Sequence, residues 1–493
     1  MTARTEGEGL LRAPARARIR LSVMQDPESI LAERGWETAE LLERAAAGRA
    51  ALVASEAGSG DARFLSLLAG ERVACSTPSF YSGWGLTDDA PAVPRRAFPR
   101  TLDEIFAGAC LLATRYIDPF HGTQSSFEET LALVAEWRRL DRLNREIGVC
   151  VGMSFWKRRR IANFLRCEAG VPKFRRGAAA AIAAAEGKAI ACWTSRMPAG
   201  LERAERLIRV EDGFVRSVGL GSDFLPPASL VLDTRGIYFD PRTKSDLEIL
   251  LAETEFDPAL LARARSLSDQ LVRRGITKYN LGARARPIEW PDGRRRILVP
   301  GQVEDDLSVV LGGGEIRGNL DLLARVREAS PDAFVVYKPH PDVLAGHRKG
   351  AVAENRVLRY ADKIVTGAST AALLGEIDEL HTLTSLSGFE ALLRGRRVVV
   401  YGRPWYAGWG LTDDRIAIER GRRLSIEELV AGALILYPRY LDPVTRLPCA
   451  PEIVIERLDQ PELWRAGPLV RARRMQGQFA RWFGRRFRRV APS

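Results

Sequence analysis

Two short motifs in the C-terminal half carry side chains that could bind a phosphate-linked group. Lys338-Pro-His-Pro-Asp342 follows the apolar run 333–337, which places Lys338 and His340 at the end of an expected strand. A lysine and a rigid imidazole there suit the phosphate of a leaving nucleotide. A single histidine after a strand more often only packs, but the flanking prolines favour a binding role. His381 could contact a base or ribose, or could equally well pack.

The second motif is a polar turn that opens a helix within residues 381–395. Ser385 and Ser387 can cap that helix, and Gly388 would let the backbone approach a ligand. Free amides and the positive end of a helix dipole suit a phosphate. Glu390, one turn later, could reach ribose hydroxyls beside that phosphate. The alternative is an ordinary capped surface helix packed on a sheet.

Three consecutive acids, Glu304, Asp305 and Asp306, follow an apolar run and Gln302. Three carboxylates in one loop can ligate Mg²⁺. One of them could instead act as a nucleophile or base in sugar transfer, where a carboxylate faces the anomeric carbon. A solvated acidic turn is the third reading, and the residues alone leave the three open.

Side chains of both signs also follow a strand in the middle of the chain. The run 207–221 passes from an apolar strand into a loop. Binding groups of parallel sheets gather beyond the carboxyl ends of the strands. The residues expected there are Glu211, Asp212, Arg216 and Ser217.

Alternating strands and helices must position all of these groups. Four short apolar runs are expected to be buried strands: 147–152, 189–193, 296–300 and 333–337. Helical stretches such as 178–186 and 318–329 lie between them. This alternation predicts an α/β fold with parallel, doubly wound sheets. We expect two linked Rossmann-like halves, 146–290 and 291–460, with a cleft between them.

A long internal repeat precedes these halves. Ser82-Gly-Trp-Gly-Leu-Thr-Asp-Asp89 recurs as Ala407-Gly-Trp-Gly-Leu-Thr-Asp-Asp414, and the similarity continues through 101–119 and 425–443. The offset of 325 residues, and then 324, is too long for a solenoid unit. It indicates a duplicated domain or part of one. Because the Trp motif is kept in both copies, we favour a structural role for it over ligand stacking.

The first copy keeps the apolar framework but not the proposed phosphate-binding groups. Phe389 corresponds to Phe64, whereas Ser385 falls on Gly60 and Glu390 on Leu65. We therefore expect residues 29–145 to be a degenerate half-module, repeating about 354–460, that serves structure and not catalysis. Residues 1–28 are expected to be a disordered leader.

Composition narrows the class of protein. At 493 residues the chain should hold several domain-sized units, and its 46% hydrophobic and 28% charged residues are those of a soluble protein. It contains no apolar run of about 18 residues and no signal-peptide core at its start. The six cysteines include no CxxC pair, which gives no zinc motif and fits free thiols in a reducing cytoplasm.

The positive charge is concentrated at the C-terminus. Residues 465–493 hold nine of the arginines and no acid, which leaves 65 basic and 62 acidic residues in the rest of the chain. Arginine mixed with Phe479, Trp482, Phe483 and Phe487 indicates an interfacial helix for an anionic membrane surface. A nucleic-acid-binding arm and a solvated terminus are the alternatives. We expect 461–493 to be a basic amphipathic tail that binds membrane and not nucleic acid.

Six ordered motifs together resemble the capsule polysaccharide biosynthesis proteins of the KpsC/LipB type. The resemblance covers about 146–460 as a full module and 29–145 as part of another. Its motifs are 210–221, Lys278-Tyr-Asn-Leu-Gly282, Val299-Pro-Gly-Gln-Val-Glu-Asp-Asp306, Lys338-Pro-His-Pro-Asp342, 384–395 and the Tyr-Ala-Gly-Trp-Gly-Leu-Thr sequence that begins at Tyr406.

The resemblance implies a retaining glycosyltransferase with a GT-B-like fold of two Rossmann-like halves. Such proteins transfer β-linked Kdo, an eight-carbon acidic sugar, from CMP-β-Kdo to a lipid-linked oligo-Kdo acceptor. They work at the cytoplasmic face of the inner membrane, as peripheral proteins, alongside other capsule-assembly proteins. No cofactor or metal is expected.

Site roles follow from the same resemblance. Asp306 would be the nucleophile that forms a glycosyl-enzyme. The donor nucleotide would contact Lys338, His340, His381, Ser385, Ser387, Gly388 and Glu390, with His340 also assigned a catalytic role. The opposite wall, for sugar or acceptor, would comprise Arg209, Glu211, Asp212, Arg216, Ser217 and Gln302.

The chain departs from the family in one large respect. Typical members carry two complete transferase modules with different linkage specificities, whereas the first module here lacks its N-terminal half. A single linkage type is therefore expected. A transferase of another nucleotide sugar and a non-catalytic scaffold of capsule assembly are the alternatives.

Overall fold

The computed structural model describes residues 60–464, apart from 91, 95, 97, 218–224, 278–287, 345 and 347. The leader 1–28, the motif 278–282 and the basic tail from residue 465 on therefore lie outside the described residues. The chain divides into two compact units, Met1–Asn144 and Arg145–Ser493, and each is described here by itself. None of the described helices is long and apolar enough to cross a lipid bilayer.

The first sheet of the larger unit has seven strands in the order β17-β16-β9-β8-β7-β5-β6. The strands β6, β5, β7 and β8 are parallel neighbours, while β9, β16 and β17 continue the sheet in antiparallel register. Their bounds are β5 Ile147–Val151, β6 Lys173–Arg175, β7 Ala189–Trp193, β8 Leu207–Asp212, β9 Ser229–Asp233, β16 Arg439–Leu441 and β17 Pro448–Cys449.

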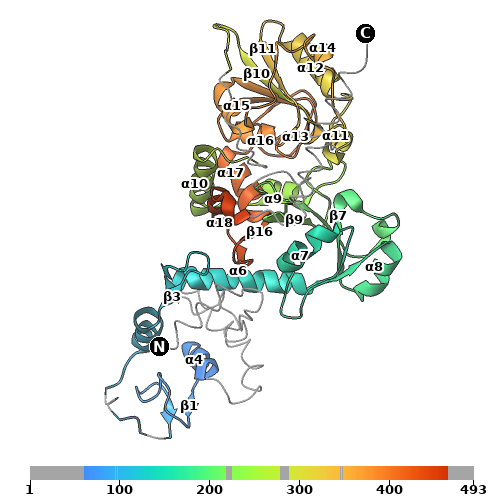
Figure 1. Cartoon of the computed structure of the whole chain (residues 1–493). Helices are drawn as coiled ribbons and strands as arrows, with labels where there is room; N and C mark the ends of the chain where they lie inside the picture. The colour runs from blue at the N-terminus through green and yellow to red at the C-terminus, as the bar shows by residue number, and fades with distance from the viewer. Residues whose placement is uncertain are drawn as a thin grey trace. The chain divides into compact units, whose positions relative to one another are not determined.

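The second sheet has six strands, all parallel, in the order β12-β11-β10-β13-β14-β15. Strands β10, β11 and β14 are rich in valine, leucine and isoleucine because helices cover both faces. Their bounds are β10 Arg296–Pro300, β11 Phe334–Lys338, β12 Lys363–Ile364, β13 Glu379–Thr382, β14 Arg397–Val400 and β15 Asp413–Asp414. The mixed α/β fold with parallel sheets is as predicted (Figure 1).

Helices connect the strands, and several begin at side-chain caps that the sequence supplies. Ser245, Asp257 and Ser369 each accept a hydrogen bond from an amide of the helix that they precede. Around the first sheet lie α7 Phe155–Phe164, α8 Ala178–Ala185, α9 Asp246–Glu253 and α10 Pro258–Arg273. Around the second lie α11 Leu307–Gly312, α12 Asn319–Ala329, α13 Pro341–Leu344, α14 Glu354–Val357, α15 Thr370–Glu376 and α16 Ser387–Leu392.

The C-terminal segment returns to the first sheet. After β15 the chain forms α17 Ile426–Val430, a π-helix η6 Ala431–Leu436 and α18 Pro451–Leu458, and these pack on α10 (Figure 1). Strand β16, between η6 and α18, pairs with β9. The sequence places this segment in the half 291–460. That assignment needs correction, because strand pairing attaches residues 425–458 to the other sheet.

Close packing and ion pairs hold this return segment. Gly432 lies so close to α9 that a Cβ there would overlap the side chain of Leu251. Arg263 of α10 pairs with Glu452 at 2.7 Å, and Arg265, two residues on, pairs with Glu427 of α17 at 2.8 Å. One apolar core runs from here through both sheets, so the two halves share buried side chains.

The smaller unit contains short elements around its own apolar cluster. They are α4 Gly60–Leu68, β1 Ala74–Cys75, β2 Asp88–Asp89, α5 Leu102–Phe106, a π-helix η2 Ala107–Ala113, β3 Tyr116–Ile117, β4 Gln124–Ser125 and α6 Phe127–Arg145. Phe64 of α4 stacks on Tyr81 with the ring centroids 5.5 Å apart. Both side chains are buried in the cluster.

Local structure recurs at the repeat positions. A capping box of Thr101 and Glu104 starts α5, which runs into η2; a capping box of Ser425 and Glu428 starts α17, which runs into η6. A tyrosine in the strand after each π-helix, Tyr116 of β3 or Tyr440 of β16, donates a hydrogen bond to a carbonyl six residues earlier. The two segments thus share hydrogen bonds as well as residue types.

The Trp motif has the same internal geometry in both places. The amides of Gly83 and Gly408 donate to Asp89 and Asp414 at 2.7 and 2.9 Å. Each motif tryptophan also donates its indole N–H to a carbonyl four residues earlier, at 3.0 and 2.9 Å. Both glycines have φ above +75°, which favours glycine. Trp409 is fully buried, which fits a packing role.

Candidate active site

Residues predicted to bind the donor nucleotide or the sugar follow three neighbouring strands of the second sheet. Gln302 comes after β10, Lys338 ends β11 and Ser385 follows β13. From β10 the chain winds outward to β11 and β12 on one side, and it then returns to β13 on the other. Ligands of doubly wound sheets bind at the carboxyl ends of the strands beside such a switch point.

Gln302 spans the switch point and keeps one buried donor unused. Its side-chain Oε1 accepts from the Thr384 amide at 3.0 Å, and its backbone N–H donates to Asn319 at 2.7 Å. Its Nε2 is buried without a hydrogen-bond partner. A buried amide N–H left unpaired costs free energy, and a ligand oxygen would satisfy it.

His340 and Lys338 stand beside this position with suitable donors. The His340 Nδ1 accepts from the Asp342 amide at 3.1 Å, so the neutral ring carries its proton on Nε2. Burial lowers the pKa of Lys338, and the charge of Glu390 opposes that shift. Lys338 and Glu390 are therefore near enough to interact, which joins the end of β11 to α16.

The turn before α16 is built largely from its own contacts. The Ser385 Oγ accepts from the Ser387 amide at 3.2 Å, and its carbonyl accepts from the Tyr406 hydroxyl at 2.6 Å. A Cβ at Gly388 would overlap the Tyr406 hydroxyl, so glycine makes room for that ring, and the approach of a ligand to its backbone stays a prediction. Glu390 is buried one turn further on.

The three acids after Gln302 are used in three different ways. Glu304 accepts from the Asn319 amide at 2.9 Å and Asp305 pairs with Arg348 at 3.2 Å, whereas Asp306 caps α11. Among the described residues no group of three or more His, Cys, Asp or Glu side chains is placed to hold a metal ion. The side chains diverge, so the arrangement gives a magnesium ion no shared set of oxygens.

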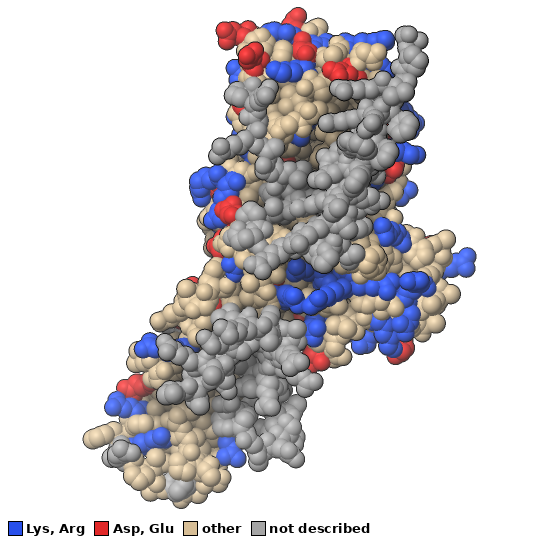
Figure 2. Space-filling model, viewed as in Figure 1, with Lys and Arg blue, Asp and Glu red and all other residues tan. Residues whose placement is uncertain are grey.

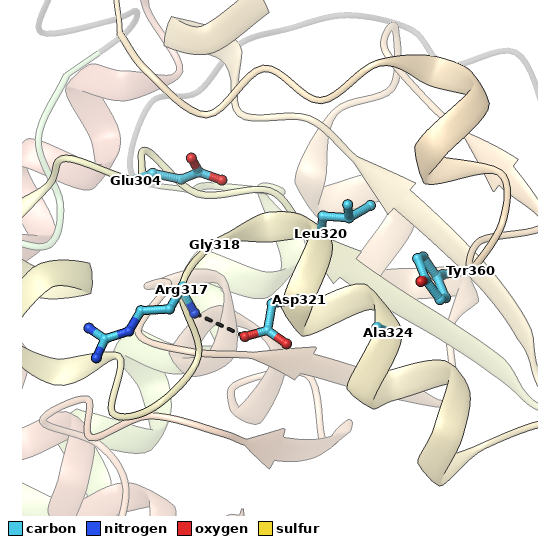
Figure 3. A pocket seen from close by; sticks show the side chains of 7 residues that line it. All are labelled: Glu304, Arg317, Gly318, Leu320, Asp321, Ala324 and Tyr360. Carbon is cyan, nitrogen blue, oxygen red and sulfur yellow. Dashed lines mark hydrogen bonds between the residues drawn. The ribbon is translucent and has the colours of Figure 1, made fainter.

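Glu304 instead lines a cavity of about 360 Å³ on the side of α12. Figure 3 shows that Glu304 comes from the loop, while Leu320, Asp321 and Ala324 come from α12. The Arg317 amide donates to Asp321 at 3.1 Å. Of the three acids in the loop, only Glu304 lines this cavity.

Asp306 keeps one oxygen accessible. Its Oδ1 accepts from the Ser308 amide at 3.0 Å and from the Ser308 hydroxyl at 2.8 Å. Its Oδ2 lies 3.9 Å from Arg348, and the side chain is 47% exposed. The first oxygen therefore orients the carboxylate while the second could react.

The carboxyl end of β8 in the first sheet carries a second charged cluster. Lys157 of α7 lies 3.2 Å from Asp212 and 3.4 Å above the ring of Trp193. Burial lowers the pKa of Lys157 to about 8. Arg216, fully buried, pairs with Asp212 at 2.7 Å and also donates to the Ser217 hydroxyl.

Glu211 is the titratable group of this cluster. The Ser195 amide donates to its Oε1 at 3.1 Å. Burial raises the pKa of Glu211 to about 7, against the pull of the positive Lys157. A carboxyl that titrates near neutrality can accept and return a proton at working pH.

Aromatic rings join the two clusters. Phe214 follows β8 by two residues and lies 4.6 Å from Trp405, ring centroid to centroid. Trp405 in turn lies 4.9 Å from Phe389 of α16. The end of β8, with its charges, is therefore held close to the helix that carries Glu390.

The sequence pattern of the family described as "Capsule polysaccharide biosynthesis protein" matches residues 188–280 and 270–440, more than half of the chain. The chain belongs to this family. Its site residues at the ends of β8, β10 and β13 all lie within the matched range. The predicted membership is thereby confirmed.

Individual relatives are similar to this member over long stretches. The capsule polysaccharide modification protein LipA of Neisseria meningitidis (serogroup A) is 42% identical over 78% of the chain. The lipopolysaccharide-processing protein LpsZ of Rhizobium meliloti is 47% identical over 48% of it. The chain spans only 56% and 54% of the lengths of these two proteins.

Two solved structures share the fold of this family member. Thermosulfurimonas dismutans KpsC, beta Kdo 2,4 transferase, superposes with a TM-score of 0.55 at 31% identity, covering 63% of this chain and 97% of its own. The beta Kdo 2,7 transferase of KpsC gives a TM-score of 0.51 at 35% identity, covering 64% and 99%.

Two predicted ligand contacts of the family member need correction. Both ring nitrogens of the buried His381 are engaged, with Glu379 at 3.0 Å and Tyr401 at 3.3 Å, so neither faces a nucleotide. Arg216 directs its N–H groups to Asp212, Ser217 and a backbone carbonyl, which makes it a positioning residue. Arg209 lies within β8, and its predicted contact with a ligand stays a prediction.

Lys157 and Trp193 are site residues that the sequence analysis missed. Lys157 stands in a basic helix, where one buried lysine looks like its exposed neighbours. Its side chain is only 9% exposed because it lies between Trp193 and Asp212. The available signal was position: Trp193 ends a buried parallel strand and Lys157 lies in the helix that follows another.

Proposed function

We propose that this chain is a glycosyltransferase that adds β-Kdo from CMP-β-Kdo to a lipid-linked Kdo acceptor in capsule polysaccharide biosynthesis. The observation that carries the proposal is the pair of charged clusters held together by the Phe214–Trp405–Phe389 rings. A donor on one wall and an acceptor on the other would meet there. The names of the two solved Kdo transferases support the sugar.

In the proposed donor site the nucleotide phosphate lies between β11 and α16. The cation of Lys338 and the Nε2–H of His340 would hold it, together with the hydroxyls of Ser385 and Ser387. Glu390 would accept hydrogen bonds from ribose hydroxyls. The unpaired Nε2 of Gln302 would bind a donor oxygen.

The proposed reaction has two displacements with retention. The Asp306 Oδ2 attacks the anomeric carbon, the bond to the CMP phosphate breaks, and its electrons leave with CMP. An acceptor hydroxyl then attacks the same carbon and Asp306 leaves as carboxylate. Glu211 would take the hydroxyl proton, since its pKa of about 7 suits a base.

We also propose that the smaller unit is a degenerate copy of about residues 354–460, without catalysis. The shared capping boxes, π-helices and Trp-motif hydrogen bonds support a common origin. A single donor site per chain follows. The expectation of one linkage type rests on the same proposal.

Membrane attachment is proposed for the tail, at the inner face of the cytoplasmic membrane. Its arginines and aromatic residues support an interfacial role beside an anionic surface. Other capsule-assembly proteins would be partners there.

Nucleotide binding tests the donor site directly. Titration calorimetry of the full chain should detect CMP at one site per chain, with UMP and GMP at least tenfold weaker. Two CMP sites would contradict the degenerate first copy. Equal binding of UMP would favour a transferase of another nucleotide sugar, and no nucleotide binding would favour a scaffold.

A further inference from the structure

A cavity of about 370 Å³ beside α7 is lined by arginines and by no acidic residue. It lies at the carboxyl ends of β5 and β6, and the residues that matter here are Gly152, Ser154, Arg158, Arg175, Arg176 and Arg196. Its volume is within the range of small-molecule sites, ~300–1,000 Å³. None of the roles assigned above uses this cavity.

The four arginines have no carboxylate partner among the described residues. Arg158 makes only a 3.4 Å contact with a carbonyl and lies over the Phe174 ring, and Arg175 donates to the Phe174 carbonyl at 3.2 Å. Figure 2 shows lysines and arginines spread over the region of α7 and α8, with few acids among them. Like charges at close range favour an anion between them.

Backbone geometry completes the cavity. Ser154 precedes the ten-residue helix α7, but its side chain caps none of the helix amides. Gly152 turns with φ +74°, and a Cβ there would lie 2.8 Å from the Arg196 carbonyl, so glycine lets the loops after β5 and β7 approach. The uncapped start of a helix adds amide donors to the guanidinium groups.

The cavity adjoins the charged cluster at the end of β8. Along α7, Lys157 faces Asp212 while the next residue, Arg158, lines the cavity. After β7, the Ser195 amide binds Glu211 while the next residue, Arg196, lines the cavity. A ligand whose reacting end is beside Glu211 could therefore extend into it.

We propose that this arginine cavity binds a carboxylate of the acceptor, on a sugar-acid residue next to the one that reacts. The inference rests on the proposed function, in which the acceptor is a chain of acidic sugars. Planar guanidinium groups bind carboxylates through paired hydrogen bonds, and four of them without carboxylate partners supply ample positive charge to neutralise one such group. Register of the acceptor chain, and hence the hydroxyl presented to Glu211, is set here.

Direct binding of a short acceptor separates this proposal from catalysis. The probe is a soluble β-Kdo disaccharide glycoside, compared with its dimethyl ester by titration calorimetry on the full chain without donor. We expect the acid to bind about tenfold or more tightly than the ester. The double variant Arg175→Gln/Arg176→Gln, and Arg196→Gln, should lose that preference while CMP binding stays unchanged.

Arg159→Gln is the matched control, because Arg159 is exposed on the same helix but does not line the cavity. It should bind the acid as the natural protein does.

Equal binding of acid and ester, an unchanged preference in the cavity variants, or no binding of the disaccharide would overturn the proposal. If the preference for the acid is lost in the cavity variants but the natural protein transfers no sugar, the carboxylate site is supported and the proposed transferase activity is contradicted. A glycerophosphate probe that competes with the disaccharide and loses affinity in the same variants would assign the cavity to the lipid phosphate and overturn the carboxylate.

Discussion

At the scale of single residues, hydrogen bonds decide which polar side chains remain available for chemistry. Gln302 keeps an unpaired amide and Asp306 keeps an exposed oxygen, whereas His381 has both ring nitrogens engaged. Residue type and spacing placed all three near the switch point. Residue type and spacing could not show which polar atoms would be hydrogen-bonded within the fold, because several of the hydrogen-bond partners come from distant parts of the chain.

Replacement of Asp306 tests its proposed role without removing the helix cap. Asparagine caps helices about as well as aspartate, so Asp306→Asn should change the melting temperature little. It should lower transfer by ~10³-fold or more, since the amide is no nucleophile. Transfer assays and thermal unfolding check the two effects. Asp305→Asn is the control and should stay active; full activity of Asp306→Asn would leave this residue as a cap only.

Glu211 predicts a pH dependence of transfer. Its pKa of about 7 means that the carboxylate, the form able to accept a proton, is lost as the pH falls below 7. The rate should therefore rise through pH 7 and level off above it. Glu211→Gln should be slow and lack this limb, while CMP binding is kept. A Glu211→Gln profile with the same limb would assign the titration to another group.

At the scale of elements, alternating and periodic patterns predicted several of the long strands and helices of the larger unit, because these depend on local burial. The strands expected at 147–152, 189–193 and 296–300 are β5, β7 and β10. The pairing of β16 with β9 was not predicted. Nothing in 425–458 marks which sheet it joins, since the choice is made by contacts with α9 and α10 that lie far away in sequence.

The two π-helices offer a matched pair of substitutions. Gly432 of η6 packs against Leu251, whereas at Gly108, its repeat equivalent in η2, an added Cβ would have no atom within 4 Å. Gly432→Leu should destabilise the larger unit by about 1–3 kcal/mol through overpacking. Gly108→Leu should be neutral or slightly stabilising. Calorimetric unfolding of both variants decides; equal effects would show that the return segment does not depend on this close approach.

At the scale of the whole molecule, charge is divided between a nearly balanced body and a basic tail. The family and the α/β architecture could be recognised from ordered motifs. What the tail binds could not be predicted in the same way, because a membrane helix and a solvated arm share this composition.

Vesicle binding tests the tail. The full chain should sediment with vesicles that contain phosphatidylglycerol, and removal of residues 465–493 should weaken this by about tenfold or more. Neutral phosphatidylcholine vesicles are the control and should bind neither form well. Equal sedimentation of both forms would place the membrane contact elsewhere in the chain.

Sugar transfer by the joined clusters can be tested in one reaction. Freshly generated CMP-β-Kdo is incubated with the full chain and a β-Kdo-terminated lipid-like acceptor, with and without EDTA, and the product is weighed by mass spectrometry. We expect one added Kdo in a single β-linkage, formed equally well with the chelator. No added sugar although CMP binds would contradict Kdo as the transferred group, and loss of product with EDTA would contradict the metal-independent displacement by Asp306.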